Sequence, residues 1–176
     1  MINILLSVRL PFSGKILSGE KTWELRKNVP RIPKGEHVTL WLYESGKDGE
    51  RAIIGKCRMV SYVRMRYMPF RCLPDDFIED FCVTGEYLRS YLPCYAWGVK
   101  DPVRLPSAVP IYVIGLTRPP QFWQYITPEQ AAILEQVACR DCPNCKHHSL
   151  LTKQSPCREC YPYGDKRLWE PRKEGE

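Results

Sequence analysis

The sequence lacks an apolar run long enough to cross a membrane. Such a helix needs about 20 consecutive apolar residues, and charges or prolines interrupt every apolar stretch of this chain before that length. No basic segment precedes the apolar start at residues 2–8, which ends at Arg9 and Pro11 and predicts a strand, not a secretory signal. We therefore expect a cytoplasmic protein that makes no contact with a membrane.

Internal repeats and low-complexity tracts are also missing, and 176 residues suit one domain of ordinary size with a small appendage. Histidine is scarce, with three residues in the chain. His37 falls in a predicted loop or strand edge, while His147 and His148 fall in a cysteine-rich end. Because histidine is the most frequent general acid or base, catalysis in the body of the chain would have to use other side chains.

Basic residues are in excess, and they are unevenly distributed. The chain has 26 Lys and Arg against 20 Asp and Glu, a net charge of +6. Residues 1–71 hold 14 basic and six acidic residues, a balance of +8, whereas residues 129–176 hold eight of each. A basic first half fits contact with a polyanion such as nucleic acid, and it fits a solvated surface that keeps the protein soluble equally well.

The hydrophobic pattern predicts an α+β fold in which short strands dominate. Apolar or alternating segments joined by short turns predict strands at residues 2–10, 21–27, 37–45, 51–65, 94–106 and 109–119. Helices are expected at 12–19, which Gly19 would end, and at 74–92, which Asp75 and Asp76 would open. Short strands with short connections indicate a compact barrel with flanking helices.

A change of composition near residue 126 predicts two domains, 1–126 and 127–176. The second begins with "TPEQAAILEQVAC", where Thr127 as the cap and Gln130 three residues later predict a helix. Beyond that helix the sequence consists mostly of cysteine, proline and charged residues. Such a segment has too little apolar content to fold alone, and bound metal would supply the missing stability.

Five of the nine cysteines crowd into this second domain. Cys142 and Cys145 form one C-x-x-C pair, and Cys157 and Cys160 form another. Two such pairs place four thiolates around one tetrahedral zinc ion. A closed four-thiolate site leaves no position for water or substrate, so we expect the zinc to be structural and not catalytic.

Other interpretations of the cysteine cluster remain open. Cys139 precedes the first pair by three residues, and either it or His147 or His148 is an alternative ligand. An iron–sulfur cluster and the absence of any metal are further alternatives. The "PC-x-x-C" and "WEP" pieces of this tail resemble the zinc knuckles of phage and bacterial accessory proteins, which implies a possible protein partner; the matching residues are Pro156, Cys157, Cys160, Trp169, Glu170 and Pro171.

The segment "GKILSGEKTWELRK" carries a charged motif, G-x-K-x-x-E-x-R, formed by Gly19, Lys21, Glu24 and Arg26. Glu24 and Arg26 alternate with apolar residues in a predicted strand, so we expect their side chains to face away from the core. On its own, this arrangement predicts a surface ion pair of little energetic value. However, the motif follows a predicted strand and helix and leads into a second strand, and this order favours a functional interpretation.

In that order the motif, together with "IIGKCRMVSYV" and "YAWGV", resembles the ASCH domain, the activating signal cointegrator homology family of the PUA-like superfold. The resemblance covers roughly residues 2–118. It implies a small pseudobarrel that binds RNA or a modified nucleotide in a cleft. Lys21 would then meet a phosphate or base carbonyl, Arg26 would offer a planar fork, and Glu24 would accept from an amine or hold Arg26.

Aromatic and basic residues near the motif are further candidates for this cleft. Trp97 is our candidate for a ring on which a base stacks, with Tyr43 and Tyr95 as alternatives, although each is also a suitable core residue. The run "VRMRYMPFR" places Arg64, Arg66 and Arg71 where they would track a phosphate backbone or form a solvated loop.

Whether the chain is an enzyme stays open at this point. Some bacterial ASCH proteins resemble amidohydrolases that use the motif lysine and a threonine three residues later, but that position is Glu24 here, and Thr22 would project from a different strand face. Our first hypothesis is a nucleic-acid-binding module with a structural zinc tail. The alternatives are a small hydrolase that acts on RNA or modified nucleosides, with Lys21 and Glu24 as catalytic candidates, and a phage accessory protein that binds a host protein.

Overall fold

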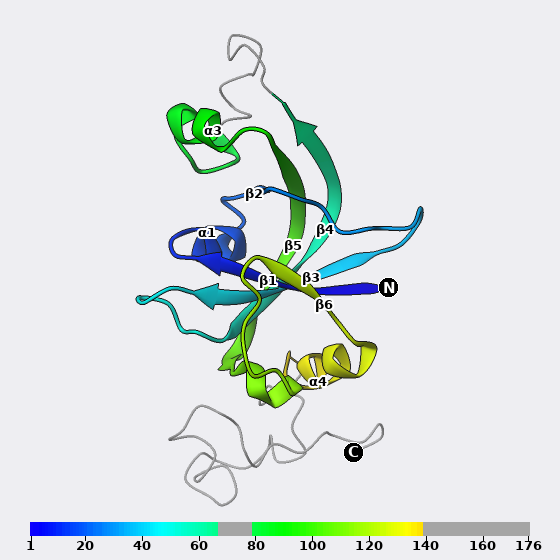
Figure 1. Ribbon diagram of the computed structural model, residues 1–176. Coiled ribbons are helices and arrows are strands. Elements are labelled where there is room, and N and C mark those ends of the chain that lie inside the picture. The colour runs from blue at the N-terminus through cyan, green and yellow to red at the C-terminus, as the bar shows by residue number, and fades with distance from the viewer. Residues whose placement is uncertain (67–78, 139–176) are drawn as a thin grey trace, which may run out of the picture.

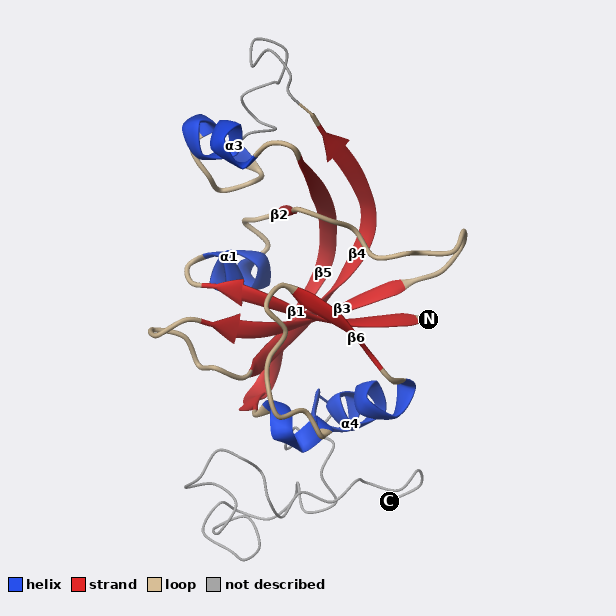
Figure 2. Cartoon of the chain, viewed as in Figure 1, coloured by secondary structure: helices blue, strands red, loops and turns tan. Residues whose placement is uncertain are grey.

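The computed structural model describes residues 1–66 and 79–138. Six strands form one mixed sheet in the order β2-β5-β4-β3-β1-β6, with helices around it, so the α+β prediction is confirmed (Figures 1 and 2). The elements in chain order are β1 (Ile2–Arg9), α1 (Phe12–Ser18), β2 (Trp23–Arg26), β3 (Val38–Ser45), β4 (Ile53–Met65), α3 (Gly85–Tyr91), β5 (Cys94–Val109), the 3-10 helix η2 (Ile111–Ile114), β6 (Trp123–Ile126) and α4 (Pro128–Ala138).

The sheet is strongly curved, and its curvature brings the two edge strands close to each other. β2 and β6 stand at opposite ends of the strand order. Nevertheless, the indole Nε1 of Trp123 on β6 donates to Oδ1 of Asn28, just after β2, at 2.7 Å. Arg26 at the end of β2 likewise donates to the backbone oxygen of Ser7 on β1. This closure by side chains, without backbone pairing between β2 and β6, makes the sheet resemble an incomplete barrel.

Side chains on β1 are buried on both faces because each face of the sheet is covered. Ile4, Leu6 and Val8 point into the curve, where they form the inner core with residues of β3, β4 and β5. Leu5 points outward into a second core that α4 and η2 cover. A third cluster lies between α3 and the end of the β4–β5 pair. Because side chains alternate along each strand, one sheet contributes to separate buried clusters on its two faces.

The helix ends follow their predicted signals. Gly19 ends α1 in the left-handed conformation, with φ of 81°, as a C-cap glycine should. At the start of α4, Thr127 Oγ1 accepts from the backbone N–H of Gln130 at 3.2 Å, and Gln130 Oε1 accepts from the backbone N–H of Thr127 at 2.9 Å. This is the reciprocal capping box that the sequence predicts.

Two predicted elements differ from the structure. The strand expected at 109–119 is wrong, because residues 111–114 form the 3-10 helix η2, which Gly115 ends at a φ of 75°. Pro110 lacks the backbone donor that a ladder requires, and the glycine permits the tight turn. The helix expected at 74–92 is not continuous: Glu79 is helical, residues 80–84 are not, and α3 begins at Gly85 after the N-cap Thr84. Asp75 and Asp76 lie outside the described residues.

The first helix of the predicted second domain packs against the sheet. Ala131, Leu134 and Val137 of α4 belong to the same buried cluster as Leu5 and Trp41. The boundary near residue 126 stays a prediction, because residues 139–176, including all four predicted zinc ligands, lie outside the described residues. Within 1–66 and 79–138, no group of His, Cys, Asp or Glu is arranged to hold a metal ion, and no helix there is long and apolar enough to cross a membrane.

Candidate functional site

The charged motif lies where the chain passes from α1 into β2. Gly19 turns the backbone away from the helix, and the backbone N–H of Lys21 then donates to the Lys15 carbonyl at 2.9 Å. This bond folds Lys21 back under the end of α1. Two residues later β2 begins at Trp23 and pairs with β5, which fixes the direction of the next side chains.

Lys21, Glu24 and Arg26 form a buried ion triad. One Glu24 oxygen, Oε1, lies 2.8 Å from Arg26 Nη2, and the other, Oε2, lies 3.5 Å from Lys21 Nζ. The three residues are only 2%, 7% and 8% exposed, respectively. Glu24 and Arg26 therefore do not face away from the core, and the prediction that they would is wrong.

The reason is the curvature of the sheet. Period-two alternation correctly places Glu24 and Arg26 on one face of β2 and Leu25 on the other. The face with Leu25 packs toward the cluster under α3, while the face with the charges is the inside of the curved sheet. Both faces of β2 are therefore buried, and the interpretation of Glu24 and Arg26 as a surface ion pair does not apply.

Backbone carbonyls hold the two cations of the triad in place. Lys21 Nζ donates to the Phe81 carbonyl at 2.5 Å, and Arg26 Nη2 donates to the Ser7 carbonyl at 2.7 Å. Burial lowers the pKa of the Lys21 ammonium below its ordinary value, and the negative charge of Glu24 opposes that shift. Arg26 Nε is buried and has no hydrogen-bond partner among the described residues, so one strong donor remains to be satisfied.

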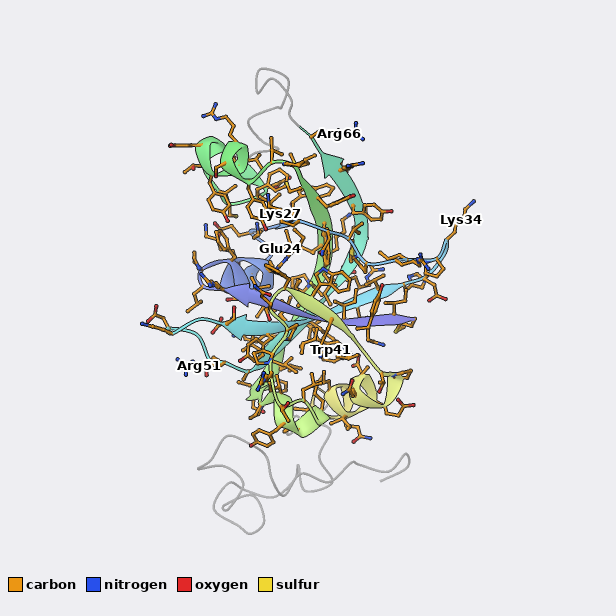
Figure 3. The ribbon with its side chains drawn as sticks, viewed as in Figure 1. Glu24, Lys27, Lys34, Trp41, Arg51 and Arg66 are labelled. Atoms are coloured by element: carbon orange, nitrogen blue, oxygen red, sulfur yellow. The ribbon has the colours of Figure 1, made fainter. Side chains whose placement is uncertain are left out.

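The triad lies at the floor of a pocket of about 340 Å³. This volume is at the lower end of the range for small-molecule sites, roughly 300–1,000 Å³. Figure 3 shows Glu24 near the centre of the molecule, between α1 and α3. Besides the triad, the lining side chains that bear on ligand chemistry are Arg9, Phe12, Tyr87, Tyr91, Gln121 and Phe122.

Four aromatic side chains line the pocket, and none of them was a predicted site residue. Tyr87 and Tyr91 on α3 stack with ring centroids 5.8 Å apart, and Tyr87 remains 46% exposed. Phe122 precedes β6 and is 49% exposed, while Phe12 lies under Lys21 Nζ with its ring centroid at 5.1 Å. Because α3 and residue 122 reach the pocket only through the tertiary fold, no local sequence pattern marks these rings.

Trp97, the sequence-predicted stacking ring, lies outside this pocket. It stands directly opposite Glu24 in the β2–β5 register, yet it is 0% exposed and packs in the inner core, with its ring 6.0 Å from that of Trp123. Tyr43 is buried in the core under α4. Tyr95 is half-buried and contacts the ring of Tyr62. The structure thus brings Lys21, Glu24 and Arg26 together, whereas Trp97 lies in the inner core and outside the pocket.

Thr22 is separated from the triad pocket. It lines another cavity of about 210 Å³, together with Cys57 and Val99, and Lys21 is the triad member that reaches this cavity. Within the triad pocket, Glu24 stands where the resemblance would place a threonine. The hydroxyl that amidohydrolase chemistry would need is therefore absent from that position.

No protein-family model matches the sequence, and no curated protein matches it either. Among solved structures, the ASCH protein from Zymomonas mobilis has a TM-score of 0.63 at 18% identity, and the match covers 77% of this chain and 94% of that one. A mutant form of that protein gives the same TM-score over 76% of this chain. The N-terminal domain of McrB from Staphylothermus marinus matches 76% of this chain and 93% of that domain, with a TM-score of 0.50 and 8% identity.

Identities of this size establish similarity of fold and nothing finer. The predicted resemblance to ASCH domains is supported at that level, and the chain has a fold similar to that of the Zymomonas mobilis ASCH protein.

Proposed function

We propose that this chain binds nucleic acid and holds one nucleotide, either of RNA or a modified nucleotide, in the triad pocket. One observation carries the proposal: three charged side chains are buried at the floor of a pocket whose walls are aromatic. A nucleotide combines a planar base, which stacks on rings, with a phosphate and polar base edges, which pair with charges. The pocket offers rings for the base and charged side chains for the phosphate and the polar base edges.

The charges at the pocket favour an anionic ligand. Lys21, Arg26 and Arg9 line it against the single carboxylate of Glu24. The planar guanidinium of Arg26 suits a phosphate or carbonyl oxygen. Glu24 keeps acceptor capacity as well, because each carboxylate oxygen has two lone pairs and each is engaged by one cation of the triad. It can therefore also accept from an exocyclic amine.

A hydrolase that acts on RNA or modified nucleosides is the second candidate, because burial lowers the pKa of Lys21 beside a carboxylate. A lysine shifted in that direction is closer to the range of a general base. Incubation with N4-acetylcytidine and with labelled RNA separates the two functions. Turnover that is lost in Lys21→Ala would establish the hydrolase and overturn the non-catalytic version of our proposal.

Removal of the exposed wall rings should weaken binding without unfolding the protein. We expect Tyr87→Ala and Phe122→Ala each to reduce the affinity for a labelled single-stranded oligonucleotide about tenfold, since stacking contributes about 1–3 kcal/mol per base. Fluorescence anisotropy measures the affinity. Tyr112→Ala is the matched control, because Tyr112 on η2 is exposed and lies outside the pocket lining. Equal affinities for all three variants would contradict the proposed site.

We further propose that Cys142, Cys145, Cys157 and Cys160 hold one structural zinc ion. The support is the spacing of the two C-x-x-C pairs, since four thiolates match the preferred donor set of structural zinc. Elemental analysis of the purified chain should find one zinc per molecule, and Cys145→Ser should lose it. Cys139→Ser should keep it, because we assign that cysteine no ligand role. Zinc retained by Cys145→Ser and lost by Cys139→Ser would overturn the assignment.

A further inference from the structure

The end of β4 extends beyond the strand that pairs with it on one side. Pairing with β3 stops at Met59, opposite Val38, whereas pairing with β5 continues to Met65, opposite Cys94. Residues 60–65 are therefore an edge in the described part of the sheet. In Figures 1 and 2 this segment rises beside β5 as a two-stranded ribbon, away from β1 and β3.

This ribbon exposes side chains that a sheet usually covers. Tyr62 is 49% exposed and Val60 is 47% exposed, and Arg64 and Arg66 are also exposed. The ring of Tyr62 meets that of Tyr95 edge to face, at 6.2 Å between centroids. We call Tyr62, Arg64 and Arg66 the ribbon strip.

Strand register connects the ribbon strip with the triad. Arg26 on β2 stands opposite Tyr95 on β5, and Tyr95 stands opposite Arg64 on β4. In the next row, Glu24, Trp97 and Tyr62 are aligned in the same way. Residues directly opposite each other share a face of the sheet. Tyr62 and Arg64 thus lie on the triad's face, two strands away, or about 10 Å at the usual strand spacing.

Within the described part of the chain, no acidic side chain neutralises the ribbon strip. Neither Arg64 nor Arg66 forms an ion pair with another described residue, and no acidic residue occurs between Met59 and Arg66. By contrast, Arg58 at the other end of this segment pairs with Asp101. Lys34, in the loop after β2, is exposed on the same side of the molecule as Arg66 (Figure 3).

We propose that the ribbon strip binds a single-stranded nucleic acid next to the nucleotide held in the triad pocket. Arg64 and Arg66 would contact backbone phosphates, and Tyr62 would stack on a neighbouring base. The partner is a single strand because a base inside a duplex cannot stack on an exposed ring. This inference rests on the proposed function and deepens it, since it defines a ligand several nucleotides long and not a free nucleotide.

Oligonucleotide length provides the test. The probes are a nucleoside monophosphate, which fills the pocket alone, and a 15-nucleotide single strand of the same base, each with ribose and with deoxyribose. We expect Tyr62→Ala and Arg64→Glu each to weaken binding of the longer strand about tenfold and to leave the mononucleotide unaffected. Arg64→Glu should also reduce the slope of log K against log salt by about 0.7 for each phosphate that the variant no longer neutralises.

Arg104→Glu is the matched control for net charge, because Arg104 is an exposed residue of β5 opposite Gly55, outside the ribbon strip. If Arg64→Glu and Arg104→Glu weaken binding of the longer strand equally, the strip does not touch the ligand and the inference is wrong. If a duplex binds as tightly as the single strand, and Tyr62→Ala weakens the binding of both, the single-strand assignment is wrong. Self-association of Arg64→Glu with unchanged binding would mean that the arginines only protect the strand edge.

Failure of the strip can be told apart from failure of the pocket. If Tyr87→Ala leaves mononucleotide affinity unchanged, the proposed function fails regardless of the ribbon. If Tyr87→Ala weakens binding of the mononucleotide while Arg64→Glu leaves the longer strand unaffected, the pocket stands and the ribbon strip does not. Thermal unfolding of each variant checks that these exposed substitutions preserve the fold.

Discussion

Replacement of Glu24 by alanine is expected to lower the free energy of unfolding by about 3–5 kcal/mol. The substitution leaves Lys21 and Arg26 buried without their shared counter-charge, and Lys21 is 2% exposed. Each cation would keep a backbone carbonyl as an acceptor, that of Phe81 for Lys21 and that of Ser7 for Arg26, but would lose its ion pair. Urea denaturation of the wild type and the variant measures the difference.

A second glutamate in the same segment supplies the control. Glu20 Oε1 lies 2.5 Å from Lys15 Nζ, but this pair is exposed. An exposed ion pair is screened by solvent, so Glu20→Ala should change the unfolding free energy little. Glu24→Gln, which keeps an acceptor oxygen but removes the charge, should fall between the two. If Glu24→Ala has no larger effect than Glu20→Ala, the triad is not buried as described.

The expected penalty also bears on why the triad exists. Removal of one partner from a buried charged group is strongly destabilising, yet well-packed apolar residues in place of the whole group are often neutral or stabilising. Stability alone therefore gives no reason for Lys21, Glu24 and Arg26 to be buried here. A pocket lined by all three does give a reason if it holds the proposed nucleotide, because that ligand would use their charges.

Strands β1 to β5, the end of α1 and the start of α4 could be predicted from local sequence. Strand β6 was not predicted, and the site could be predicted only in part. Gly19 and the Thr127–Gln130 capping box act within one turn, so their signals are local. The motif likewise identified Lys21, Glu24 and Arg26 as a group. Their burial was not predictable, because alternation separates two faces of a strand without showing which of them the fold covers.

The pocket walls depend on packing between distant parts of the chain. Tyr87 comes from α3 and Phe122 from the approach to β6, and both reach β2 only because the sheet curves. The same curvature places Trp97 inside the molecule instead of in the pocket. Aromatic residues near the motif are visible in the sequence, but strand register and closure determine which of them line the pocket.

Substitutions at Trp97 test whether this indole belongs to the core or to the ligand site. Trp97→Ala should lower the free energy of unfolding by about 3–5 kcal/mol, because it leaves a cavity in the inner core. Trp97→Phe should cost much less. The indole Nε1 is buried with no partner among the described residues, so phenylalanine removes an unsatisfied donor and keeps a ring in the cluster.

Trp123→Phe is the matched control, because its Nε1 donates to Asn28 Oδ1 and phenylalanine cannot make that bond. Urea denaturation gives the stability of each variant, and anisotropy gives its affinity for the single-stranded oligonucleotide. We expect Trp97→Phe to keep wild-type affinity, since Trp97 does not line the triad pocket. If Trp97→Phe instead keeps wild-type stability and loses affinity, Trp97 contacts the ligand. In that case Glu24 would have to move when the nucleotide binds, so that the pocket reaches Trp97.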